Sequence, residues 1–151
     1  MALSSISLKG RALRYLSARE HSRAELERKL RVHEEEPGQL AQALDELQAK
    51  GFISEQRVVE SVIHRRAGKL GAARIRQELQ AKGLSGEAVE QALAPLQGTE
   101  LERAGELWRR KFAEPPADAA ARAKQMRFLM ARGFSGDVAS RVLRTADRED
   151  A

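Results

Sequence analysis

Residues 71–93, GAARIRQELQAKGLSGEAVEQAL, decide the fold predicted for this 151-residue chain. The first half of the stretch has apolar residues at helical spacing: Ala72, Ile75 and Leu79. Gly83 is typical of a residue that ends a helix in the left-handed conformation, and Ser85 is expected to cap the next helix. The apolar face of that second helix is Val89, Ala92, Leu93 and Leu96. The stretch therefore predicts two short helices joined by a tight corner.

The corner recurs along the chain with a period near 50 residues. It reappears in residues 129–138, LMARGFSGDV, and a less regular copy lies earlier, with its apolar residues at Leu26, Leu30, Leu40, Ala43 and Leu44. We therefore predict an all-α protein of three tandem three-helix repeats, forming an elongated, curved array. The predicted repeats are residues 1–53, 54–98 and 99–146, followed by a frayed charged tail at 147–151.

Helix-start signals support this division. Ser22 with Glu25, and Thr99 with Glu102, have the spacing of a capping box, and Ser54 is expected to cap the helix after it. Helices are predicted at about 8–18, from Ser22 to about His33, and at about 117–132. Trp108 lies four residues before Phe112, a spacing that places both on the core face of their helix.

Composition argues against several classes of protein. The chain has no cysteine, and no stretch is apolar enough to cross a membrane, so we expect a soluble, cytoplasmic protein. The three histidines, His21, His33 and His64, lack metal-ligand spacing and are expected at the surface or at helix ends. The sequence also lacks a phosphate-binding loop, and its two Gly-x-Ser-Gly corners are better explained as helix caps. We therefore predict no catalytic site, no metal and no cofactor.

Several motifs together resemble the RecX family, regulators of the RecA recombinase. In the first repeat they are Ala12–Leu16, Arg19, Ser22, Glu25-Leu26 and Lys29-Leu30. In the second they are Gly71, Arg74-Ile75, Glu78-Leu79 and Lys82-Gly83-Leu84. In the third they are Lys124, Arg127–Leu129, Arg132–Ser135 and Val142. The chain departs from the family pattern at Val58 and Val59, where relatives commonly have aromatics, and at His33-Glu34, which replaces a Lys-Gly corner.

The resemblance implies a monomer that lodges in the groove of a RecA filament on single-stranded DNA. There it is expected to inhibit ATP hydrolysis, strand exchange and the coprotease activity of the SOS response, with weak direct DNA binding as a further expectation.

Basic side chains are the candidate contacts, since the net charge is +5. Basic and acidic residues number 9 and 8 in residues 1–53, 7 and 5 in 54–98, and 11 and 9 in 99–151. The excess positive charge lies in the last two repeats, and the candidate contact residues there are Arg57, Arg65, Arg66, Lys69, Arg74, Arg76, Lys82, Arg109, Arg110, Lys111, Arg122, Lys124, Arg127 and Arg132.

A helix-turn-helix DNA-binding protein, such as a transcription regulator, is the alternative interpretation. The helices after Ser85 and Ser135 would then read bases, yet both are expected to be poor in base-reading residues. Residues 84–93 contain Glu87, Glu90 and Gln91 but neither Arg nor Lys. We therefore rank the filament regulator above the DNA reader.

Three serial repeats predict a size that scattering can measure. A compact globule of this length has a radius of gyration of roughly 15 Å, whereas an open array of three modules is expected to exceed about 18 Å as a monomer. Small-angle X-ray scattering of the monomer tests this. A value near that of the compact globule would contradict the open array.

Overall fold

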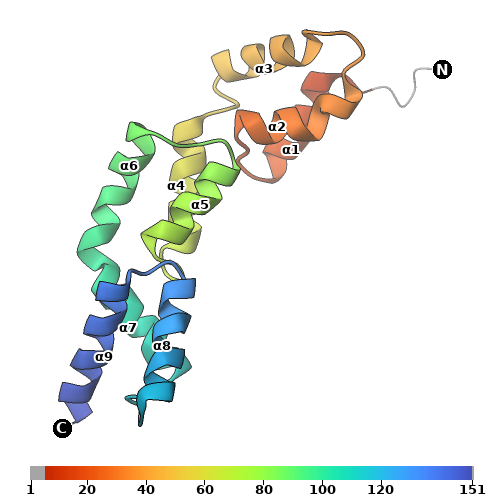
Figure 1. Ribbon diagram of the computed structural model, residues 1–151. Helices are drawn as coiled ribbons and strands as arrows, with labels where there is room; N and C mark the ends of the chain where they lie inside the picture. Colours follow the sequence, from red (N-terminus) through yellow and green to blue (C-terminus); the bar gives the residue numbers. More distant parts are fainter. Residues whose placement is uncertain (1–5, 151) are drawn as a thin grey trace. The chain divides into compact units, whose positions relative to one another are not determined.

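The computed structural model describes residues 6–150, and in that range all regular structure is helical, which confirms the all-α prediction (Figure 1). The α-helices are α1 (Leu8–Ala18), α2 (Arg23–Leu30), α3 (Gln39–Ala49), α4 (Glu55–Arg66), α5 (Ala72–Ala81), α6 (Glu87–Leu93), α7 (Glu100–Lys111), α8 (Ala119–Ala131) and α9 (Gly136–Asp150). Two 3-10 helices follow α2 and α6: η1 (Arg31–His33) and η2 (Ala94–Thr99).

Packing divides the chain into two compact units. The first holds residues up to Ser61 together with Gln80–Leu84, and the second holds Val62–Leu79 and the chain from Ser85 onward. The division passes through α4 and α5, so the packed units do not coincide with the three sequence repeats. The repeat boundaries themselves stay a prediction.

The core of the first unit lies between α1, α2 and α3. Its buried side chains are Ala12, Leu26, Leu30, Leu40, Leu44, Leu47 and Ile53. The capping box that opens α2 is present as predicted, because the Ser22 hydroxyl accepts from the Glu25 amide at 3.1 Å and Glu25 accepts from the Ser22 amide at 3.0 Å. This double cap fixes the start of α2 against the loop from α1.

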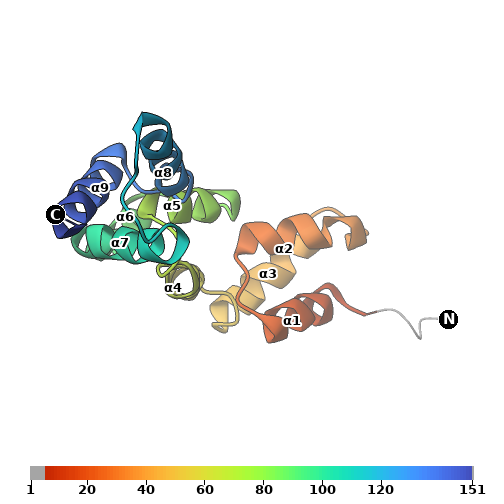
Figure 2. The ribbon, with the colours of Figure 1, turned by 90° about the horizontal axis from the view of Figure 1, so that it is seen from below.

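The main core of the second unit lies between α7, α8 and α9, which Figure 2 shows side by side. Its buried side chains are Ala104, Leu107, Trp108, Leu129, Phe134, Ala139, Val142, Leu143 and Ala146. The core position predicted for Trp108 is confirmed, and its indole N–H donates to the Gln125 side chain at 2.7 Å. The helix α9 continues through Asp150, with Ala146 buried in this core, so the segment predicted as a frayed tail begins inside a helix. Its fraying stays a prediction. Residue 151 lies outside the described residues.

Two predicted caps differ in the structure, and one is confirmed. Ser54 accepts from the Arg57 amide at 3.2 Å, as a cap should. The residue that caps α6 is Gly86 rather than Ser85, with φ 101° and no side-chain bond. Thr99 forms no capping box, because η2 runs directly into α7 and leaves no separate helix start to cap.

Glycine is required at the corners for two separate reasons. Gly83 and Gly133 have φ values of 80° and 96°, which confirms the left-handed corners. Gly71 has an ordinary φ, but its amide donates to the Arg132 carbonyl at 2.7 Å and an added Cβ would collide with the Gly133 carbonyl. At Gly133 both reasons apply, since an added Cβ would also lie 2.6 Å from the Arg74 amide nitrogen.

Alanine substitutions at three glycines should separate the conformational cost of a positive φ from the cost of a Cβ collision. We expect Gly51→Ala, at φ 84° with open space around it, to lower the free energy of unfolding by about 1–2 kcal/mol. Gly133→Ala adds a backbone collision to the same conformational cost and should destabilise more. Chemical denaturation measures both, with Gly98→Ala as the control because Gly98 has neither constraint. Equal stability of the Gly133 variant and wild type would contradict the close approach.

Candidate partner-binding surface

The candidate surface consists of the basic side chains predicted to contact a partner, and some of these are half-buried or ion-paired. Of the predicted contacts, Arg66, Arg76, Lys82 and Arg122 are half-buried and the rest are exposed. Five form ion pairs: Arg57 with Glu20 at 2.8 Å, Arg66 with Glu78 at 2.9 Å, Arg76 with Glu90 at 2.8 Å, Lys82 with Glu25 at 3.3 Å and Arg110 with Glu106 at 3.8 Å.

Lys82 belongs to a partly buried network in the first unit. Glu25 accepts from Arg19 at 2.7 Å, and Lys82 contacts the same oxygen at 3.3 Å. The Ser22 hydroxyl donates to the Lys82 carbonyl at 2.6 Å, which ties the end of α5 to the start of α2. Burial alone would raise the pKa of Glu25, but the hydrogen bonds from Arg19 and the Ser22 amide, with the charge of Lys82, lower it to about 2. The charge of Lys82 is therefore paired with Glu25 within the first unit.

Arg76 and Arg66 also stabilise the fold. Arg76 donates to both oxygens of Glu90, at 2.8 and 2.9 Å, and so joins α5 to α6. These hydrogen bonds raise the pKa of Arg76 and lower that of Glu90. Arg66 joins α4 to α5 through Glu78. Arg65 and Lys69, which lie close to Arg66 in the sequence, are exposed and have no carboxylate partner in the described part of the second unit.

The backbone contact at Gly71 brings distant basic residues together. The Gly71 amide donates to the Arg132 carbonyl. Lys69 precedes Gly71 by two residues and Arg74 follows it by three, so both lie in the segment that contacts Arg132. Arg74 also packs directly against Gly133. We name Lys69, Arg74, Arg132 and Lys111 the basic seam. All four are exposed, and none is ion-paired among the described residues of their unit.

Phe128 joins the last two members of the basic seam. The Arg132 guanidinium lies 5.0 Å and the Lys111 ammonium 5.9 Å from its ring centroid, so the ends of α7 and α8 share one cationic surface. Phe112 packs edge-on against the same ring, with centroids 5.4 Å apart. Lys124 and Arg127 are exposed elsewhere on α8, whereas Arg122 donates to the Ser140 hydroxyl at 3.3 Å.

Two sets of arginines were missed in the sequence. Arg103 is a structural residue: its guanidinium donates to the carbonyls of Ala67 at 2.6 Å and Leu70 at 2.7 Å, and burial lowers its pKa. No sequence signal marks it. By contrast, the spacing of Arg141, Arg144 and Arg148 places three exposed arginines on one side of α9. The expectation that the helix after Ser135 is poor in base-reading residues was therefore wrong, although it holds for α6.

His21 directly precedes Ser22, the cap of α2, so it lies at a helix end as expected, and it is buried there. Its Nδ1 lies 3.1 Å from the Arg19 carbonyl oxygen and its Nε2 lies 3.0 Å from Lys29 Nζ. Burial lowers its pKa. Within residues 6–150, no group of three His, Cys, Asp or Glu side chains is placed to hold a metal ion. In the same residues, no helix combines the length and apolarity needed to span a membrane.

Short helices joined by repeated glycine corners define an all-α protein of tandem three-helix modules. Family models agree in detail: the first, second and third three-helix domains of RecX match residues 9–47, 54–93 and 99–143. The chain belongs to the RecX family. This confirms the resemblance seen in the sequence.

Relatives and solved structures are similar over nearly the full length. Regulatory protein RecX of Leptothrix cholodnii is 61% identical over 144 residues, covering 95% of this chain and 92% of the relative. That of Ralstonia nicotianae is 51% identical over 142 residues, covering 94% and 89%. The crystal structure of RecX from Lactobacillus salivarius shares the fold, with a TM-score of 0.75, 23% identity, and 93% and 94% of the two chains covered.

The Glu25 network predicts a specific acid sensitivity. Because the pKa of Glu25 is lowered from 4.5 to about 2, its ionised form stabilises the protein fully above pH 4.5, and this contribution is lost as the pH falls toward 2. We expect Glu25→Gln to lower the free energy of unfolding by about 2 kcal/mol at neutral pH and to flatten its decline below pH 4.5. Urea titrations across this range measure both effects. The exposed Glu36→Gln is the control, and identical pH profiles for all three proteins would contradict the network.

Proposed function

We propose that this protein is a non-enzymatic inhibitor of RecA that binds in the groove of the RecA filament on single-stranded DNA. Bound there, it reduces ATP hydrolysis, strand exchange and coprotease activity, and so limits recombinational repair and the SOS response in the cytoplasm. The observation that carries the proposal is the ordered match of all three RecX domains across residues 9–143.

The surface chemistry supports a charged partner. The basic seam and Arg65 are exposed and keep their charges free of ion pairs in the described part of their unit. A nucleoprotein filament offers DNA phosphates and acidic protein side chains, both of which attract such residues. Repeated modules also suit a repeating partner, because each module adds contacts at a high effective concentration once the first has bound.

A helix-turn-helix reader of duplex DNA is less well supported. The corresponding helix of the second repeat, α6, has only seven residues and includes Glu87 and Glu90. Glu90 is held by Arg76, so its carboxylate is a fixed part of that surface. Phosphates near this face would be repelled. The arginines of α9 are the observation that keeps direct DNA binding as an outcome to be tested.

Charge reversal at Arg65 and Lys69 tests the proposed inhibitor function. Arg66 is left unchanged because its reversal would also break the pair with Glu78. Arg65→Glu with Lys69→Glu should weaken inhibition of the single-strand-dependent RecA ATPase at least about tenfold, and inhibition by wild type should fade as salt rises. Exposed substitutions of this kind usually change stability by only about 0.5 kcal/mol each, and circular dichroism checks that both proteins are folded.

Arg14→Glu with Arg31→Glu is the matched control, since it makes the same change in net charge at exposed positions of the first repeat. This control should inhibit RecA as wild type does. Equal inhibition by the Arg65/Lys69 variant would exclude these two side chains as contacts. No inhibition by wild type, together with a preferred duplex sequence, would overturn the proposal in favour of the DNA reader.

A further inference from the structure

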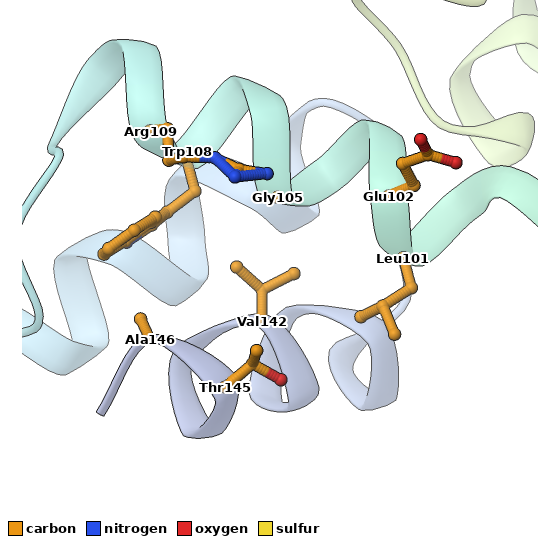
Figure 3. A pocket seen from close by; sticks show the side chains of 8 residues that line it. All are labelled: Leu101, Glu102, Gly105, Trp108, Arg109, Val142, Thr145 and Ala146. Atoms are coloured by element: carbon orange, nitrogen blue, oxygen red, sulfur yellow. The ribbon is translucent and has the colours of Figure 1, made fainter. Parts of the chain in front are cut away.

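A groove runs between α7 and α9 on the second unit (Figure 3). Its lining residues are Leu101, Glu102, Gly105, Trp108, Arg109, Val142, Thr145 and Ala146. The groove has a volume of about 180 Å³. This is comparable to the roughly 150 Å³ engineered cavity that holds a benzene ring, so a branched apolar side chain can enter it.

The groove exists because α7 has a glycine where a side chain would fill it. An added Cβ at Gly105 would meet only the tip of the Arg109 guanidinium, at 3.7 Å. Leu101 and Val142 project between the two helices in Figure 3, and Trp108 lies beside them. Glycine in the middle of a helix costs about 1 kcal/mol relative to alanine, so Gly105 keeps this space open at the expense of helix stability.

Arginines border the apolar groove along α9. A second hollow continues from the first through Leu101 and Thr145 and is lined by Arg141, Arg144 and Arg148. All three are exposed, and none has an ion-pair partner among the described residues of the second unit. Among the described residues that line the two hollows, one has a carboxylate, Glu102, and this group points away from α9 (Figure 3). This face therefore combines an apolar slot with a row of exposed arginines that form no ion pair among the described residues.

We propose that the α7–α9 groove binds an acidic peptide segment of a protein partner, with an apolar side chain in the slot and flanking carboxylates on Arg141, Arg144 and Arg148. Arginine binds carboxylates through paired hydrogen bonds, and the apolar side chain gains by leaving water. The site is separate from the basic seam, and its existence does not depend on RecA being the partner.

Nucleic acid fits the groove less well. A bound single strand usually stacks its bases on exposed aromatic faces, but Trp108 is only 5% exposed and its N–H is committed to Gln125. Phosphates would engage the arginines and leave the apolar slot unused. An acidic peptide with an apolar residue uses both halves of the surface.

Trp108 supplies the measurement, because it is the only tryptophan in the chain and lines the groove. The probe is a synthetic tryptophan-free peptide with one leucine flanked by glutamates and aspartates, titrated into the full-length protein. We expect a saturable change in Trp108 fluorescence. A peptide with serine in place of the leucine should bind about tenfold more weakly, and the affinity should fall as salt rises.

Two variants test the two halves of the site. Gly105→Leu fills the slot while improving helix propensity, so the protein should stay folded and lose at least about tenfold in peptide affinity. Arg141→Glu with Arg144→Glu should lower the peptide affinity by a similar factor. Arg14→Glu with Arg31→Glu, which has the same net charge, should bind as wild type does. Affinities for the Gly105 variant are measured by calorimetry, because its new side chain lies next to Trp108.

Other outcomes would overturn the inference. The first is that the leucine peptide does not bind saturably. The second is that the serine peptide binds with the same affinity as the leucine peptide. The third is that a single-stranded oligodeoxynucleotide binds more tightly than the peptide, and that this binding is lost in the Arg141/Arg144 variant but kept in Gly105→Leu. That result would assign the arginines to nucleic acid. Failure of RecA inhibition with intact peptide binding would count against the proposed function alone.

Discussion

The second unit depends on a close approach between two backbone segments, at Gly71 and at Gly133, where any side chain would collide. The Gly71 amide bonds to the Arg132 carbonyl at 2.7 Å, and Gly133 lies directly against Arg74. A Cβ on either glycine would force the start of α5 away from the corner between α8 and α9. The contact joins segments about 60 residues apart, and it brings Lys69 and Arg74 of the basic seam to the corner that contains Arg132.

Arg103 supports the same region from α7. Its guanidinium donates to the carbonyls of Ala67 and Leu70, which belong to the loop just before Gly71, and to that of Leu96 at 3.2 Å. It also lies 5.7 Å from the ring centroid of Phe134, next to Gly133. One half-buried cation therefore satisfies carbonyls that a loop without regular structure would otherwise leave unpaired. This part of the second unit is held by polar contacts of this kind as well as by the apolar core.

Charge on this molecule has two different uses, and burial separates them. Lys82 and Arg76 are held by Glu25 and Glu90 and connect helices, whereas Lys69 and Arg132 have no such partner in the described part of their unit and face solvent. In the sequence all four look alike, because a basic residue on a helix carries no mark of its partner. Five of the fourteen predicted contact residues are ion-paired in this way, and the other nine remain candidates. The three arginines of α9 join them as a separate surface.

Local chemistry determined most of the secondary structure from the sequence. Apolar spacing located the helices, the Ser22–Glu25 box opened α2, and glycine at 83 and 133 produced the corners. These features act within a few residues, so the sequence displays them directly. The tertiary structure alone decided the division into two units, the anchoring role of Arg103, the burial of His21, and which cations are neutralised. Each depends on contacts between residues far apart in the chain, and helical periodicity shows which face is buried but not what lies against it.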